Sequence, residues 1–184
     1  MMDRKGFLRR TCLAGVCGCG FGALALNAGN VTRSDQDGVN QMPQQWLIRL
    51  LENLDRNVDK AELRKIIKMS AGVHYDQLKM DELLSGYTGK LREFIGFLEN
   101  DWGWKVDYDE STGVLLADEN KDYCVCPVLK GTAATESPVI CYCSEGFAEK
   151  MFSKVAGVDV TAEVVSSVRR GDKSCIYKVQ LPVG

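Results

Sequence analysis

The segment that most constrains the fold begins at Cys141 and ends at Cys175, because it joins paired cysteines, a helix and a closing hairpin. Cys141 and Cys143 stand at the end of an expected strand, and an amphipathic helix follows them directly. A second Cys-x-Cys pair, Cys124 and Cys126, lies just upstream. Successive side chains of a strand alternate between its faces, so each pair would present two sulfurs to one side. The sequence therefore predicts five thiols gathered at one region of a shared sheet.

Residues 1–28 form an expected export signal. The sequence DRKGFLR at residues 3–9 resembles the bacterial twin-arginine motif, and an apolar, glycine-rich run follows over residues 12–26. This run is too short and too rich in glycine for a transmembrane span. We therefore expect export by the twin-arginine pathway to the periplasm or another extracytoplasmic space. A weak resemblance to a lipoprotein cleavage site leaves lipid anchoring at Cys19 as the alternative.

The remaining chain divides into a linker and one domain. Residues 29–42 are polar without periodicity, which is typical of a disordered linker. Residues 43–184 are expected to form a single domain, since 45% of the chain is hydrophobic and 26% is charged. The net charge is −2 at pH 7, and four of the 23 basic residues lie in the expected signal. The mature chain would be more acidic still, so a nucleic-acid partner is not expected.

Hydrophobic periodicity changes along the domain from helical to alternating. Leucines at i, i+3 and i+4 spacing, and Asp59 as an N-cap, predict helices in the first half. Alternating apolar residues around turn sequences predict hairpins in the second half. The expected elements are helices at 43–54, 59–69, 81–84 and 88–102, a hairpin of 104–108 and 114–117, strands at 123–129 and 138–143, a helix at 144–157, and a closing hairpin of 158–168 and 174–181. This order predicts an α+β fold in which one helix crosses a mostly antiparallel sheet.

Motifs within residues 88–181 resemble a known family. They are Cys124-Val125-Cys126-Pro127, Cys141-Tyr142-Cys143-Ser144-x-Gly146-Phe147, Phe152-x-x-Val155-x-Gly157-x-x-Val160, and Glu163-x-x-x-Ser167-x-x-Arg170-Gly171-Asp172-x-x-Cys175. Together they resemble the 4-vinyl-reductase domain superfamily, especially its branch of L-2-amino-thiazoline-4-carboxylic acid hydrolase-like proteins. The resemblance implies a ligand-binding fold shared with vesicle-tethering subunits and nitric-oxide sensor domains. It implies a small-molecule or metal-binding role more directly than it implies a reaction.

The resemblance also implies a metal site, although this chain departs from its pattern. Phenol-sensing members of the superfamily hold zinc with a Cys, a Glu and two further Cys. Cys175 stands where the last of these cysteines is expected, and Glu163 is close to the position of the glutamate. Ser167 occupies the preceding Cys position, so the zinc set does not carry over intact. By their spacing, Cys126 and Cys143 could supply the missing sulfur ligands.

The five cysteines outside the signal permit three interpretations. Four thiolates could hold zinc at about 2.3 Å, or an iron–sulfur cluster could use the same ligands. Disulfides are natural in an exported protein, although an odd number of cysteines leaves one unpaired. The thiols could also be inert core residues or a nucleophile. Cys143 lies beside an expected helix N-terminus, which would lower its pKa. A base within reach would have to be His74, the single histidine, in an expected loop.

Two functions of different classes remain. The first is an exported domain that binds a metal or a small molecule, with zinc or an iron–sulfur cluster as cofactor. Its expected metal ligands are Cys124, Cys126, Cys141, Cys143 and Cys175, with Glu163 as a ligand contact. The second is a hydrolase acting on a small substrate with a C–N bond, which follows from the resemblance alone. No paired carboxylates, Ser/His/Asp arrangement or phosphate loop supports it, so we favour the binding domain. Membrane contact is expected only through the signal or a lipid anchor, and a homodimer is left open.

Overall fold

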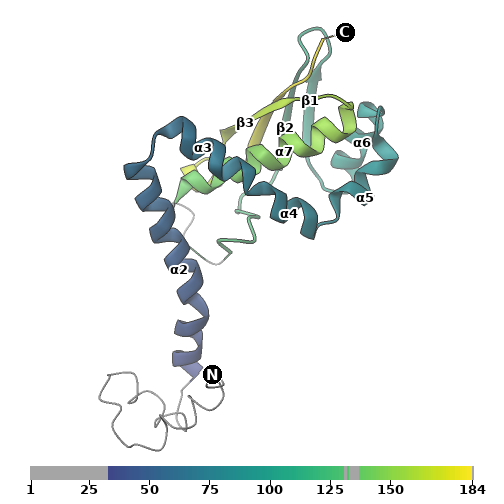
Figure 1. The fold of residues 1–184 in the computed structure, drawn as a ribbon. Coiled ribbons are helices and arrows are strands. Elements are labelled where there is room, and N and C mark those ends of the chain that lie inside the picture. Colours follow the sequence, from purple (N-terminus) through teal and green to yellow (C-terminus); the bar gives the residue numbers. More distant parts are fainter. Residues whose placement is uncertain (1–32, 131, 133–136, 184) are drawn as a thin grey trace, which may run out of the picture. The chain divides into compact units, whose positions relative to one another are not determined.

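A computed structural model describes residues 33–130, 132 and 137–183, with side chains from Met42 onward (Figure 1). The expected export signal, with its twin-arginine motif and Cys19, lies outside the described residues. The chain divides into two compact units, Met1–Pro43 and Gln44–Gly184. Among the described residues, no helix combines the length and the apolar composition that a membrane span needs.

The described residues of the second unit form an α+β domain in which helices precede most of the strands. Its helices and strands, with the preceding helix α2, are α2 (Arg33–Asn57), α3 (Lys60–Met69), α4 (Ala71–Gln77), α5 (Met80–Leu84), α6 (Leu91–Asn100), β1 (Lys105–Asp109), β2 (Val114–Asp118), α7 (Cys141–Ala156), β3 (Thr161–Ser166) and β4 (Ile176–Gln180). Short 3₁₀ turns lie at Ser85–Tyr87, Pro138–Ile140 and Val168–Arg170. The predicted fold class is confirmed.

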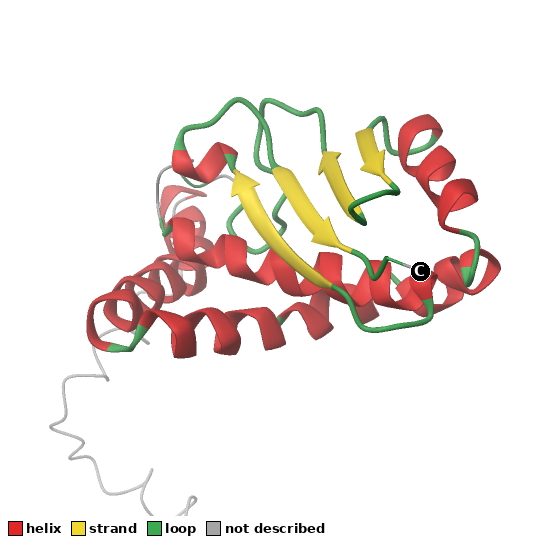
Figure 2. Ribbon diagram, turned by 90° about the horizontal axis from the view of Figure 1, so that it is seen from above, coloured by secondary structure: helices red, strands yellow, loops and turns green. Residues whose placement is uncertain are grey.

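The strands form one antiparallel sheet in the order β1-β2-β4-β3. Figure 1 shows α7 running across one face of this sheet, with α3 and α4 on the far side of α7. From above, Figure 2 shows the strands side by side, with most of the helices along one side of them. The second unit is therefore layered as sheet, α7, then α3 and α4.

Several local predictions are confirmed. Asp59 caps α3, because its carboxylate accepts hydrogen bonds from the backbone N–H groups of Ala61 and Glu62 at 2.9 and 3.2 Å. The helix α7 ends at Gly157, whose φ of 72° is the left-handed conformation that glycine adopts easily. Both predicted hairpins form, as β1–β2 and β3–β4.

The two predicted strands that carry the Cys-x-Cys pairs are wrong. Residues 123–129 form no regular element, and Pro127 within them could not donate to a sheet ladder. Residues 138–140 form a 3₁₀ turn and Cys141 opens α7. Pro138 favours a helix start, since its φ is fixed near the helical value and its missing N–H would have no partner there. A short apolar run bounded by turns fits a buried helix as well as a strand, so periodicity alone did not separate them.

The start of α2 also differs from the prediction. The helix begins at Arg33, so residues 33–42 are helical where a linker was predicted, and Pro43 lies inside the helix. Proline removes one intrahelical hydrogen bond, because it has no N–H to donate, but the turns on each side of it remain. Pro43 therefore does not mark the first turn.

Close packing between α3 and α7 depends on Gly146. A Cβ atom at this position would lie 2.2 Å from the backbone oxygen of Lys68, which is far inside van der Waals contact. Glycine therefore allows the two helix backbones to approach. The core beneath them is formed by buried residues of α3, α6, α7 and the sheet, among them Leu63, Phe94 and Phe152.

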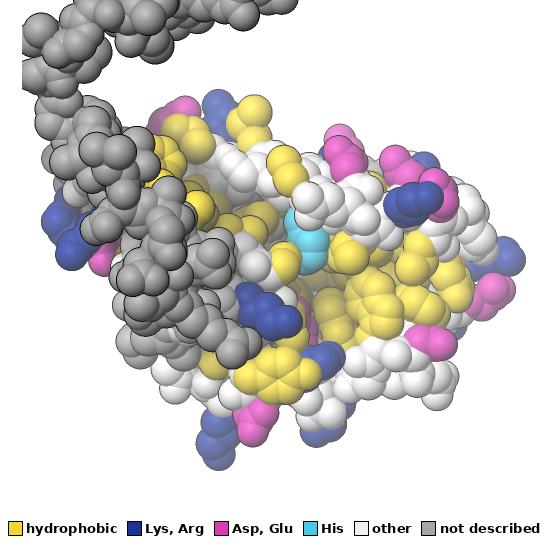
Figure 3. All heavy atoms as spheres, turned by 90° about the horizontal axis from the view of Figure 1, so that it is seen from below, with side chains coloured by type: hydrophobic (Ala, Val, Ile, Leu, Met, Phe, Trp, Pro, Cys, Tyr) yellow, Lys and Arg dark blue, Asp and Glu magenta, His cyan; other side chains and the backbone are white. Residues whose placement is uncertain are grey.

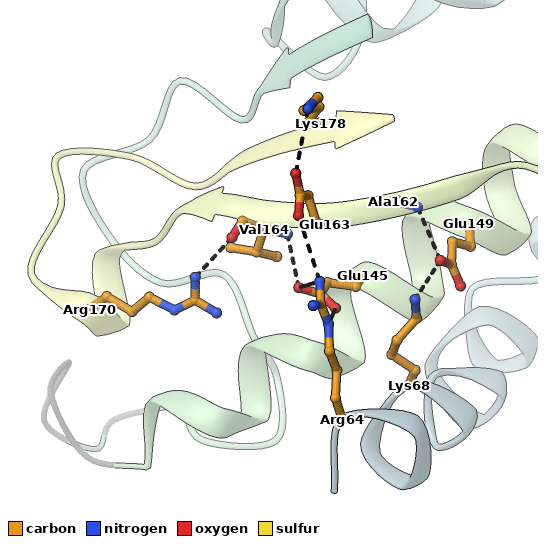
Figure 4. Close-up of polar contacts among 9 residues, drawn as sticks. All are labelled: Arg64, Lys68, Glu145, Glu149, Ala162, Glu163, Val164, Arg170 and Lys178. Atoms are coloured by element: carbon orange, nitrogen blue, oxygen red, sulfur yellow. Dashed lines mark hydrogen bonds and ion pairs between the residues drawn. The ribbon is translucent and has the colours of Figure 1, made fainter. Parts of the chain in front are cut away.

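Side chains of α7, together with Arg170, form hydrogen bonds with the backbone at the outer edge of strand β3 (Figure 4). Glu145 accepts a hydrogen bond from the backbone N–H of Val164 at 3.0 Å, and Glu149 accepts one from the N–H of Ala162 at 3.0 Å. Arg170 donates to the carbonyl of Val164 at 2.8 Å. The edge that β4 does not pair is thus bonded to side chains.

Basic side chains of α3 neutralise these carboxylates. Arg64 donates to both oxygens of Glu145, at 2.7 and 3.0 Å, and Lys68 pairs with Glu149. The Glu145 side chain is only 1% exposed, so its charge depends on this pairing. We call this set of four charged residues and the backbone of β3 the ionic seam.

Candidate functional site

A cavity of about 450 Å³ lies between α7, the ends of β2 and β4, and the segment of residues 119–128. Figure 3 shows a hollow on the face seen from below, with hydrophobic side chains gathered in and around it. The apolar lining residues are Leu78, Trp102, Trp104, Val125, Pro127, Val128, Ile140, Phe147, Ala148 and Met151, joined by five cysteines. The polar lining residues are His74, Glu119, Lys121, Ser144, Arg169 and Tyr177. The cavity is thus mainly apolar, with few polar groups.

All five predicted cysteines line this one cavity. Cys124 and Cys126 lie on the irregular segment after β2, Cys141 and Cys143 in the first turn of α7, and Cys175 immediately before β4. The predicted gathering at one region therefore occurs. The shared sheet is wrong, because all five cysteines lie outside strands: two in a loop, two in a helix turn and one just before β4.

Burial keeps the thiols of Cys141, Cys143 and Cys175 protonated. Loss of solvation raises the pKa of Cys143 to about 11 and that of Cys175 to about 11, and it also raises the pKa of Cys141. The sequence predicted a lowered pKa at Cys143 from the N-terminus of α7. That prediction is wrong, because desolvation outweighs the helix dipole at this position. A protonated thiol is a poor nucleophile.

No group of metal-binding side chains is preformed among the described residues. Within the described ranges, no group of three or more His, Cys, Asp or Glu side chains is arranged to hold a metal ion. All five cysteines are free thiols, and the Cys141 sulfur lies 3.1 Å from the Ser167 hydroxyl in a buried contact. Zinc or an iron–sulfur cluster stays a prediction from the sequence.

Aromatic rings form part of the cavity wall. Trp104 lies between Trp102 and Tyr177, with ring centroids 5.4 and 5.8 Å away. Phe147 of α7 contacts the ring of His74 at 5.0 Å. Offset and tilted rings at these distances stabilise one another and form a firm apolar surface. A flat organic molecule could pack against this surface.

His74 is a helix residue and not a loop residue. It lies in α4 and lines the cavity, and burial lowers its pKa. A neutral imidazole could in principle accept a proton from a thiol. Its contact among the described residues is the ring of Phe147, and no hydrogen bond from His74 to a described cysteine is present. The described geometry therefore lacks the thiol–imidazole pair that a cysteine nucleophile uses.

Glu119 is the buried acid of the cavity. It directly follows β2, is 6% exposed, and accepts a hydrogen bond from the Tyr177 hydroxyl on its Oε1 atom. Its other oxygen, Oε2, is buried and has no hydrogen-bond partner among the described residues. Burial raises the pKa of Glu119, whereas the Tyr177 hydrogen bond and the charge of Lys121 oppose that rise. The pKa of Tyr177 is raised well above 10 by burial, so its hydroxyl keeps its proton and donates it.

Two basic residues fix the loop that closes the cavity. Lys121 donates to the backbone oxygens of Trp102 and Glu119 at 3.2 and 3.3 Å. Arg169 is 2% exposed and donates to the carbonyl of Leu129 at 2.8 Å and to the Thr132 hydroxyl at 3.1 Å. The irregular segment that carries Cys124 and Cys126 is therefore hydrogen-bonded to the rest of the domain on both sides of these cysteines.

Glu163, the predicted ligand contact, lies elsewhere. It is on β3 with its side chain 48% exposed, near Arg64 at 3.9 Å and Lys178 at 3.7 Å (Figure 4). It is not among the residues that line the cysteine cavity. The structure therefore brings the five cysteines together and leaves Glu163 beside the ionic seam.

Glu119, Tyr177 and Trp104 are cavity residues that the sequence patterns did not predict. One signal could have identified Glu119, because Leu115 and Ala117 are buried at alternating positions of β2 and Glu119 continues that alternation. An acid at the next inward position of a strand is costly unless it has a role or a partner. Tyr177 and Trp104 follow the same alternating pattern as core residues do, so their pattern alone does not distinguish them.

Comparisons with known proteins identify one family and similar solved structures. Trafficking protein particle complex subunit 3 from Naegleria fowleri, covalently bound to palmitic acid, is 14% identical, with a TM-score of 0.41 over 77% of this chain and 96% of that chain. The phenol-responsive sensory domain of the transcription activator PoxR, with phenol, is 17% identical, with a TM-score of 0.39 over 74% and 73%. No curated protein matches. Residues 26–183 match the family described as "Family of unknown function (DUF6144)", and the chain belongs to that family.

Proposed function

We propose that the second unit is a binding domain for a small, mainly apolar organic molecule, held in the cysteine-lined cavity. The observation that carries this proposal is the cavity itself, about 450 Å³ in volume and lined mostly by apolar and aromatic side chains. Cavities of about 300–1,000 Å³ with apolar walls and a few polar groups are typical of small-molecule sites. The cavity volume suits a molecule of one or two rings.

The chemistry of the walls favours binding over reaction. Two of the cavity thiols stay protonated, since burial raises the pKa of Cys143 and Cys175 to about 11. Trp102 and Trp104 offer ring surfaces, which attract apolar and aromatic molecules. A hydrolase would need an activated nucleophile or water, and the described cavity has no thiol–imidazole pair to supply one. We therefore do not propose the hydrolase that the sequence resemblance suggested.

The finer parts of the proposal rest on the sequence. The cysteine and glycine motifs favour a relationship to the 4-vinyl-reductase superfamily, and the basic motif at residues 3–9 favours action outside the cytoplasm. Mass spectrometry of the protein from its native host tests export, because an intact Met1 end would rule out the cleaved signal. Metal analysis of untagged protein tests the zinc and iron–sulfur prediction, which stoichiometric metal would support.

Binding can be tested with N-phenyl-1-naphthylamine, a neutral dye that fluoresces more strongly in apolar surroundings. We expect saturable binding of one dye per chain and energy transfer from Trp102 and Trp104. A Trp46→Phe background removes the signal of an exposed tryptophan, 63% accessible and absent from the cavity lining. Dye fluorescence that rises linearly without saturation would contradict the proposal.

Cavity-filling variants locate the bound dye. Ala148 is buried in the cavity wall, so Ala148→Leu should weaken dye binding by about tenfold or more by occupying its volume. Cys126→Trp fills the same space from the loop side and serves if the first variant does not fold. Ala61→Leu is the matched control, because Ala61 is exposed on α3 outside the cavity. Equal weakening by the control, or none by either cavity variant, would place the dye elsewhere.

A further inference from the structure

The cavity contains one polar atom whose bonding the fold leaves incomplete. The Glu119 side chain is more than nine-tenths buried and lines the cavity, and its Oε2 atom has no hydrogen-bond partner among the described residues. Buried carboxylate oxygens are almost always bonded, because an unbonded one loses its hydration without replacement. An atom in this condition in a cavity wall marks a place where a bound molecule can donate a hydrogen.

The neighbouring groups determine which oxygen of the Glu119 carboxylate can accept a hydrogen bond from a ligand. The Tyr177 hydroxyl donates to Oε1, and this hydroxyl stays protonated because burial raises its pKa well above 10. The backbone N–H of Glu119 donates to the Cys175 carbonyl at 2.9 Å, which extends the β2–β4 pairing by one residue. The carboxylate is therefore held by its backbone on one side and by the tyrosine on Oε1, and Oε2 is left for a ligand.

The surroundings of Glu119 also restrict the body of the ligand. Trp104 stacks on Tyr177, the residue that holds the carboxylate, and Trp102 lies against Trp104. Lys121 stands next to Glu119 in the wall, but its amino group donates to two backbone oxygens. Glu119 thus shares the cavity wall with the indole rings of Trp102 and Trp104. These rings favour a ligand with a flat apolar body beside its hydrogen-bond donor.

We propose that this cavity selects flat apolar molecules that carry an N–H or O–H donor, and that Glu119 Oε2 is the acceptor that binds this donor. This inference rests on the proposed binding function and adds to it the chemical class of the ligand and the residue that recognises it. Glu119 acts as a specificity residue, and Tyr177 is a positioning residue that holds Glu119 by its Oε1 atom. A molecule of the same shape with only an acceptor would place two lone pairs against each other and bind more weakly.

Three bicyclic probes separate the contribution of the hydrogen-bond donor to binding from that of the apolar rings. Indole carries one N–H donor, quinoline carries one ring-nitrogen acceptor, and naphthalene carries neither. Each is titrated against the dye-loaded protein at pH 7, and displacement gives its affinity. We expect indole to bind about tenfold or more tightly than quinoline, since a buried acceptor left without a hydrogen bond costs about this much. Equal affinities of indole and quinoline in the unmodified protein would overturn the inference, and would indicate that Oε2 is bonded only to water.

Two variants assign the preference to Glu119. In Glu119→Gln the amide oxygen can still accept from Tyr177 while the NH₂ group turns toward the cavity, so the preference should reverse toward quinoline. In Tyr177→Phe the Glu119 carboxylate can still accept a hydrogen bond but is no longer held by its Oε1 atom, so the preference for indole should shrink without reversing. An unchanged preference in Glu119→Gln would also overturn the inference.

The naphthalene measurement keeps the two proposals apart. Naphthalene tests only the apolar body, so its affinity should be the same in the unmodified protein and in Glu119→Gln. If naphthalene binds while indole shows no preference over quinoline, the donor-selecting role of Glu119 fails and the binding function stands. If none of the three probes displaces the dye, the binding function itself fails.

Discussion

The ionic seam and the cysteine cavity flank the same helix, α7, yet they treat buried polar groups in opposite ways. In the seam, Glu145 is 1% exposed and accepts hydrogen bonds from Arg64 and from the Val164 backbone. In the cavity, Glu119 is 6% exposed and one of its oxygens has no partner among the described residues. Both carboxylates are desolvated. Both oxygens of Glu145 accept hydrogen bonds within the domain, whereas only one oxygen of Glu119 does so among the described residues.

This difference separates residues that hold the fold from residues that are available to a ligand. A buried carboxylate whose bonds are all internal stabilises the elements it connects, and its loss costs stability. A buried carboxylate with an open bond costs stability in the free domain, and a ligand can recover that cost. We therefore expect substitutions in the seam to change unfolding and substitutions in the cavity to change binding.

The largest expected effect is loss of the seam carboxylate. Glu145→Ala leaves Arg64 without its partner and the Val164 N–H without an acceptor, so we expect a loss of about 3 kcal/mol in the free energy of unfolding. Urea titration followed by circular dichroism measures this loss. Glu145→Gln is the matched control, since its amide oxygen can still accept from Val164 and the loss should be smaller. A loss below about 1 kcal/mol in Glu145→Ala would remove the distinction between seam and cavity.

A smaller loss is expected where the seam helices approach each other. Gly146→Ala places a Cβ atom 2.2 Å from the Lys68 backbone oxygen, so the helices must separate at a cost of about 1–3 kcal/mol. Gly96→Ala is the control on α6, where the nearest atom that a Cβ would meet is 4.0 Å away. That control should stabilise the domain by about 0.5–1 kcal/mol through higher helix propensity. Destabilisation of equal size in both variants would contradict the close approach.

The smallest effect on folding is expected from the cavity thiols. What can be measured there is how their rate of reaction with iodoacetamide depends on pH. Folded Cys143 and Cys175 have pKa values of about 11 against an ordinary value of 9.0, so the folded state holds their protons more tightly. The stability from this shift is fully present below pH 9.0 and is lost as the pH rises through about 11. Iodoacetamide labelling of Cys143 and Cys175, followed by mass spectrometry, should therefore accelerate near pH 11 in folded protein and near pH 9 in urea. Equally fast labelling of both forms at pH 7 would contradict buried, protonated thiols.

Much of the fold follows from local patterns in the sequence. Alternation in residues 104–117 and 158–181 predicts both hairpins, because one face of each strand is buried against α7 or the core. Asp59 predicts the start of α3, since a short acid suits the free N–H groups of a first helical turn. These signals need only neighbours along the chain, so a single sequence contains them.

The site could be predicted only in part. The five cysteines were expected together and do line one cavity, but the expected strand geometry was wrong because Val139, Ile140 and Cys141 are apolar in sequence and fit a strand as well as a helix start. The raised thiol pKa values and the partner of Glu119 depend on burial by residues distant in sequence, such as Tyr177. No local pattern encodes those contacts.

The bonded edge of β3 has a consequence for how copies of this chain can associate. An exposed strand edge is a template on which another chain can add a strand, which leads to open-ended association. At β3, the N–H groups of Ala162 and Val164 already donate to Glu149 and Glu145, so an incoming strand would have to displace two paired carboxylates. The opposite edge strand, β1 (Lys105–Asp109), carries alternating charged residues, which disfavour an added strand in the same way. Growth by sheet extension is therefore opposed at both ends of the sheet, and a self-complex of this domain would form through its helices or loops.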